Sequence, residues 1–99
     1  FWPDSWLGPR AHISKASYGQ SPNLHLSGRA ARDCELVILA KGEVVKRAVL
    51  GQNEEVNIEF PAPQDTPLLL EFSSSITDSA GRELSFLVSS TNLFAERDL

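Results

Sequence analysis

The chain has 99 residues, 41% of them hydrophobic, and a formal net charge of -4. This acidic balance argues against a protein that binds the nucleic-acid backbone, which needs a basic surface, and against attraction to an anionic membrane. The length fits one domain with its own core, and because the chain contains no methionine, residues 1–99 are expected to be a single module excised from a larger protein.

Short segments in which hydrophobic and polar residues alternate occupy most of the chain. A period of two is typical of strands with one buried and one solvated face. In chain order, strands are expected at residues 11–16, 24–30, 34–40, 43–50, 54–60, 68–75 and 82–89. Turn residues such as Lys41-Gly42 separate them. The sequence therefore predicts an all-β fold, an antiparallel two-sheet β-sandwich of about seven or eight strands, immunoglobulin-like or jelly-roll-like.

Three prolines between residues 61 and 67 exclude a central strand there, because proline cannot donate a ladder hydrogen bond. This segment is expected to connect two strands and to cross from one sheet to the other. The core is expected to consist of the inward-facing hydrophobic residues of the strands, namely Ile13, Leu26, Leu36, Ile38, Val45, Val56, Ile58, Phe60, Leu68, Leu70, Phe72, Leu84, Phe86 and Val88.

The single cysteine, Cys34, shares the alternation of Leu36 and Ile38 and is expected to be a small core residue. Asp33 and Glu35 flank it with the wrong charge for a reactive thiolate. One cysteine allows no internal disulfide, which favours a reducing compartment, so the sequence favours the cytoplasm without fixing the location. No hydrophobic run reaches the ~18 residues of a membrane span, and membrane insertion is not expected.

Catalysis is not expected in this domain. His12 and His25 are the only imidazoles, and His25 is expected to point outward from a strand between Leu24 and Leu26. The chain has no Gly-x-Ser-x-Gly turn to present a nucleophilic serine. One cysteine and two scattered histidines do not suggest a metal site, and no cofactor is expected.

Three aromatic residues near the start of the chain, Trp2, Trp6 and Tyr18, are candidates for ligand binding. Exposed aromatic rings in loops between strands can stack against the C–H face of a sugar. The alternative, which the sequence favours for Trp6, is a ring that closes one open end of the sandwich.

Arg82 is the fourth candidate for ligand binding, because its guanidinium could hold a carboxylate or a phosphate. It follows a turn made by Asp78 and Gly81, in which the acid can accept loop N–H groups and the glycine can adopt a positive φ. The alternative, again the favoured one, is an arginine that pairs with a nearby acid and holds the loop in place.

The order of these motifs resembles a known group of domains. The first motif is the tryptophan-containing segment Asp4-Ser5-Trp6-Leu7-Gly8, which precedes the first strands. It is followed by Leu24-x-Leu-x-Gly28 and by a hairpin at Gly42, and the start of the last long strand contains Gly81-Arg82-x-Leu84-Ser85-Phe86. The chain is similar in this to the small β-sandwich modules appended to bacterial glycosyltransferases that build surface polysaccharides. It departs from their Asp-x-Arg pattern at Ala80, where the nearest acid is Asp78.

The resemblance implies a non-catalytic accessory domain of a carbohydrate-active protein, with carbohydrate and a neighbouring domain of the parent chain as partners. The alternative is a structural or protein-interaction sandwich without a ligand of its own. The turn Asp78-x-x-Gly81 also resembles a turn of bacterial immunoglobulin-like domains, and those domains act as spacers or adhesive modules.

Overall fold

The computed structural model describes residues 6–14, 21–63 and 66–93. These residues form ten strands and no helix, and consequently no helix that could cross a membrane. The strands are β1 (Trp6–Leu7), β2 (Arg10–Ile13), β3 (Asn23–Ala30), β4 (Cys34–Ala40), β5 (Glu43–Leu50), β6 (Glu55–Pro61), β7 (Leu68–Phe72), β8 (Ile76–Thr77), β9 (Glu83–Leu84) and β10 (Phe86–Thr91).

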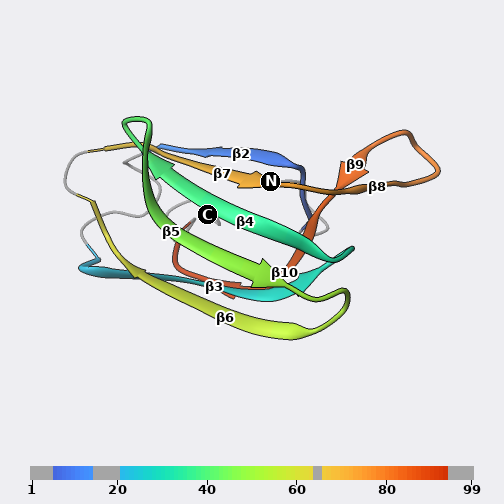
Figure 1. The fold of residues 1–99 in the computed structure, drawn as a ribbon, viewed down its shortest axis with the longest axis horizontal. Helices are drawn as coiled ribbons and strands as arrows, with labels where there is room; N and C mark the ends of the chain where they lie inside the picture. Colours follow the sequence, from blue (N-terminus) through green and yellow to red (C-terminus); the bar gives the residue numbers. More distant parts are fainter. Residues whose placement is uncertain (1–5, 15–20, 64–65, 94–99) are drawn as a thin grey trace, which may run out of the picture.

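Eight of these strands form two antiparallel sheets, which confirms the predicted sandwich (Figure 1). Sheet A has the order β1-β10-β3-β6 and sheet B the order β2-β7-β4-β5. The short strands β8 and β9 pair with each other in a ribbon that projects from one end of the sandwich. In an immunoglobulin constant domain the last strand lies in the same sheet as strands C and F. In this chain the last strand, β10, pairs with β3 in sheet A, and the edge position beside β7 in sheet B is occupied by β2.

The connections follow the turn chemistry of the sequence. The hairpin between β4 and β5 turns at Lys41 and Gly42, both of which have a positive φ. The proline-containing segment after β6 leads from sheet A to β7 in sheet B, as predicted. A crossing is possible there because the prolines end the pairing of β6 and leave no strand to continue in the same sheet.

The core lies between the two sheets. Leu36 and Ile38 of β4 have no exposed surface, and Phe86 of β10 stacks on Phe72 of β7 with ring centroids 5.6 Å apart and an angle of 20° between the planes. This ring pair therefore joins sheet A to sheet B. The burial of Cys34 is also confirmed.

Eleven of the fourteen predicted core residues are buried. Val45, Val56 and Val88 are half-buried at the margin of the core instead. Val45 and Val56 lie in β5 and β6, the edge strands of their sheets. Val88 lies where the pairing of β10 with β3 shifts at a bulge. An edge or a bulge leaves one side of the strand without neighbours, so a residue there is only partly covered.

Two predicted strands are shorter or more divided than the alternation suggested. The predicted strand 68–75 ends as β7 at Phe72, and the next strand, β8, begins only at Ile76. The predicted strand 82–89 divides into β9 and β10 at Ser85. Ser85 is fully buried, and its hydroxyl donates to the carbonyl of Ser74 at 2.9 Å. At this point the chain leaves the projecting ribbon and enters sheet A, so one continuous strand cannot form. The predicted strand 11–16 is β2, from Arg10 to Ile13, and residues 15–16 lie outside the described residues.

Candidate ligand-binding surface

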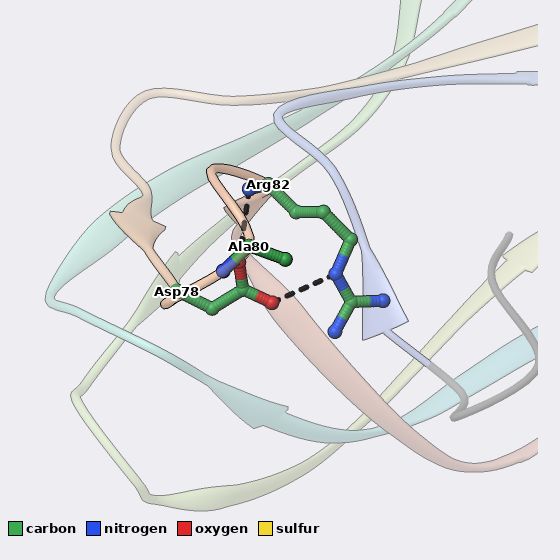
Figure 2. A network of polar contacts seen from close by, with 3 residues as sticks. All are labelled: Asp78, Ala80 and Arg82. Atoms are coloured by element: carbon green, nitrogen blue, oxygen red, sulfur yellow. Dashed lines mark hydrogen bonds and ion pairs between the residues drawn. The ribbon is translucent and has the colours of Figure 1, made fainter.

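The loop that carries Arg82 is held by Asp78. One carboxylate oxygen of Asp78 accepts hydrogen bonds from the backbone N–H groups of Ala80 and Arg82, each at 2.9 Å. The other accepts from Nε of Arg82 at 2.7 Å (Figure 2). Gly81, with a φ of 86°, completes the turn and donates its N–H to the carbonyl of Asp78. The loop therefore forms a closed unit between β8 and β9.

These contacts hold the pKa of Asp78 below its ordinary value of 3.8, first through the backbone N–H of Arg82 and then through its side chain. Asp78 thus makes the acid–arginine contact that the sequence left in doubt because position 80 is alanine. Arg82 holds the loop, as its favoured interpretation predicted. Its alternative role as a clamp for a ligand stays a prediction.

Trp6 lies in β1 and faces outward from sheet A. Its neighbour Leu7 is 1% exposed and pairs with the fully buried Phe86, so Trp6 and its cross-strand partner Leu87 occupy the opposite, outer side. The indole is half-buried there. Trp6 is therefore neither fully exposed nor a member of the buried core, and the interpretation that its ring closes one open end of the sandwich stays a prediction. Trp2 and Tyr18, the other two aromatic candidates, lie outside the described residues.

The strand register extends a row of side chains from Trp6 across the whole of sheet A. Leu87 of β10 lies opposite Arg29 of β3, and Arg29 lies opposite Glu55 of β6. Because Gly28 and Ala30 on either side of Arg29 are buried, this row faces outward. One aromatic, one aliphatic and two charged side chains therefore follow one another on the outer side of the sheet.

Further polar side chains follow along the same strands. We name the outer side of sheet A between β10 and β6 the polar face, formed by His25, Ser27, Arg29, Glu55, Asn57, Glu59, Ser89 and Ser90. These residues alternate with the core residues of β3 and β6, apart from the two serines of β10, which lie at its bulge.

Hydrogen bonds fix the side chains of the polar face relative to one another. Ser27 donates to Oδ1 of Asn57 at 2.6 Å, and Nδ2 of Asn57 donates to Glu59 at 3.1 Å. In the first row, Nε of Arg29 and the hydroxyl of Ser89 donate to the two oxygens of Glu55, at 3.1 and 3.0 Å. These contacts, that with Arg29 first, lower the pKa of Glu55 from its ordinary value of 4.5.

His25 is the one imidazole on the polar face, and Nε2 lies 3.2 Å from the hydroxyl of Ser90. A serine next to a histidine is part of a nucleophilic site only when an acid orients the imidazole and the serine is presented to a substrate. Among the described residues, no carboxylate is hydrogen-bonded to His25, and both residues lie on strands rather than on a strained turn. The arrangement is that of two surface side chains in contact.

A shallow hollow of about 440 Å³ opens at the end of the polar face where β3 begins and β6 ends. It is lined by Asn23, Leu24, His25, Glu59, Phe60 and Pro61. Beside the hollow, the side chain of Asn92 accepts a hydrogen bond from the backbone N–H of His25 and donates one to the carbonyl of Asn23. The hollow continues the polar face and adds depth at its far end from Trp6.

The remaining chemistry-bearing residues are dispersed. In the parts of the chain that the structure describes, no three His, Cys, Asp or Glu side chains gather in a way that could hold a metal ion. Burial raises the pKa of the Cys34 thiol above its ordinary value of 9.0, with Asp33 contributing in the same direction. His12 lies on the outer side of sheet B, whereas His25 lies in sheet A.

Of the two candidates among the described residues, Trp6 belongs to this surface and Arg82 does not, and the polar face itself was missed. Its signal was present as polar residues alternating through β3 and β6. What the sequence could not show is that these two strands, separated by β4 and β5, pair with each other. A comparison of the chain with protein-family models and with curated proteins gives no match.

Proposed function

We propose that the chain is a non-catalytic accessory domain of a carbohydrate-active protein of the glycosyltransferase type, and that it holds or guides glycan. The observation that carries the proposal is the position of Trp6 on the same outer side of sheet A as the polar face. Sugar recognition needs this combination, because a pyranose ring offers C–H groups to an aromatic surface and hydroxyls to hydrogen-bonding side chains.

The motif order of the chain gives independent support. It resembles the β-sandwich modules of bacterial glycosyltransferases in its tryptophan-containing lead-in and in the Gly81-Arg82 entry to the last long strand. The pattern places the acid at position 80, which is alanine here, and Asp78 makes the contact with Arg82 in its place. On this proposal the parent protein is bacterial and supplies the catalytic domain.

The proposal is tested on an array of glycans with the wild-type domain, a Trp6→Ala variant and a His12→Ala control. Wild type and His12→Ala are expected to bind the same glycans, because His12 lies on the outer side of sheet B. Trp6→Ala is expected to lose most of the signal. An array without any wild-type signal contradicts the proposal.

A second candidate function is a structural or protein-interaction module, and the edge strand β5 supports it. Val49 is 87% exposed and Val44 45% exposed, which is unusual for two large aliphatic side chains on one strand. Arg47 lies between them and contacts Glu35 at 3.6 Å. A negative glycan array together with weaker attachment of a Val49→Asp variant to its parent protein supports this second function over the first.

A further inference from the structure

Resting on the proposed function, we propose that the polar face of sheet A is the binding site, and that its ligand is an uncharged, hydroxyl-rich oligosaccharide. The chain lies across the outer side of the sheet, with one sugar unit against Trp6 and another at the hollow beside His25 and Glu59. The proposal assigns a role to residues that the sequence did not single out.

The first argument is preorganisation. The hydrogen bonds from Ser27 through Asn57 to Glu59, and those of Arg29 and Ser89 with Glu55, fix the directions of six polar side chains before a ligand arrives. A ligand that meets side chains already held in place loses less conformational entropy on binding.

The second argument is the hydrogen-bonding capacity that remains. Among the described residues, Arg29 donates to Glu55 through Nε, and its side chain is 56% exposed, so its two terminal nitrogens can donate to a ligand. Asn57 keeps one N–H, and the Glu59 carboxylate keeps acceptor positions beyond the amide of Asn57. Donors and acceptors therefore alternate over the surface. A sugar hydroxyl both donates and accepts, so neighbouring hydroxyls match such a surface better than a ligand that only donates or only accepts.

The third argument is charge. Arg29 is already paired with Glu55, and within the described part of the chain Glu59 accepts from the amide of Asn57 and pairs with no cation. The polar face therefore carries a net negative charge, as does the chain as a whole. An anionic ligand is repelled, and an uncharged one is not.

The fourth argument is extent. The row of Trp6, Arg29 and Glu55 and the row of His25 and Glu59 lie four residues apart along β3, about 13 Å at the rise of a strand. The surface between them is open and not enclosed. A single sugar cannot contact both rows, so the geometry favours an oligosaccharide.

The test uses the wild-type domain, two variants of the polar face, Asn57→Ala and Glu59→Ala, and the matched control Glu43→Ala on β5. All three substituted positions are exposed, so urea midpoints close to that of wild type are expected and show that the variants fold. Affinity for a neutral oligosaccharide taken from the array is measured by calorimetry. Each polar-face variant is expected to weaken binding by about five- to tenfold, which corresponds to the loss of about one hydrogen bond, while Glu43→Ala binds like wild type.

Further outcomes separate this inference from the proposed function. No binding of any glycan by wild type contradicts both. Binding that is unchanged in Asn57→Ala and Glu59→Ala leaves the proposed function standing and overturns the site. Binding only of anionic or only of amino sugars overturns the ligand class. Since the ligand is uncharged, the affinity is expected to be nearly the same at ~0.05 and ~0.5 M NaCl, and a steep loss with salt also contradicts the ligand class.

Discussion

The substitution Gly28→Ala tests whether the close approach of β10 to β3 depends on the lack of a side chain at this position. Gly28 lies opposite Val88, next to the bulge of β10. A Cβ placed on it would meet the carbonyl oxygen of Leu87 directly and would lie 2.8 Å from Cε2 of Phe86. The oxygen belongs to the backbone and the ring is fully buried, so neither can turn aside.

The magnitude follows from the movement required. Ordinary contact begins at 3.4 Å, so the Phe86 ring alone has to retreat by 0.6 Å, the difference between 3.4 and 2.8 Å, and the Leu87 carbonyl by more. Overpacking of this kind costs ~1–3 kcal/mol, and two weakened ladder hydrogen bonds add ~1–3 kcal/mol. Alanine also reduces the conformational entropy of the unfolded chain, which offsets ~0.4–1 kcal/mol of this cost. We expect Gly28→Ala to lower the free energy of unfolding by about 3 kcal/mol.

The assay is urea denaturation followed by circular dichroism, with Gly42→Ala as the control. Gly42 has a φ of 78° and open space around its Cβ position, so its substitution brings backbone strain without a clash and costs about 1 kcal/mol. With a slope of ~2 kcal/mol/M, Gly28→Ala shifts the midpoint by about 1.5 M. A Gly28→Ala midpoint equal to or above that of Gly42→Ala would refute the close approach of the two strands.

Three further predictions concern other parts of the sandwich. Ser85→Ala leaves the carbonyl of Ser74 without its buried donor and is expected to destabilise the domain by ~1–3 kcal/mol in the same assay, whereas the exposed Ser79→Ala stays close to wild type. Because the pKa of Asp78 is lower in the folded state, its contribution to stability is fully present above the ordinary value of 3.8 and is lost as the pH falls through the folded value. The difference in stability between wild type and Asp78→Ala is therefore expected at pH 7 and should shrink by pH 3; a difference that grows on acidification contradicts it. Cys34, buried and with a raised pKa, should react slowly with iodoacetamide at pH 8 in the native protein and quickly in urea, and equal rates would show that the thiol is accessible.

The sequence predicted the strands best where the alternation and the turn chemistry indicate the same boundaries. Residues 34–40 and 43–50 became β4 and β5 with the predicted boundaries, because alternation and the Lys41-Gly42 turn agree there. The division at Ser85 was not predicted, since a serine between Leu84 and Phe86 fits the alternation as well as its neighbours do. Only the folded chain shows that this serine is buried against the carbonyl of Ser74.

The candidate site was predictable only in part, for a related reason. The pairing of Arg82 with Asp78 is local in sequence, four residues apart, and could be weighed from the turn pattern alone. The neighbourhood of Trp6, Leu87 and Arg29 depends on three strands from distant parts of the chain. Alternation predicts which residues face outward but not which outward residues become neighbours, because the order of strands in a sheet is set by tertiary packing.

Mapping of backbone amide and tryptophan indole chemical shifts during titration with a neutral oligosaccharide tests the central claim most directly. The account predicts shifts at the Trp6 indole and along β3 and β6, from Arg29 and Glu55 to His25 and Glu59, with sheet B and the Asp78–Arg82 loop unchanged. Saturable shifts confined to sheet B or to that loop, or a titration without any shift for the glycans of the array, would contradict it.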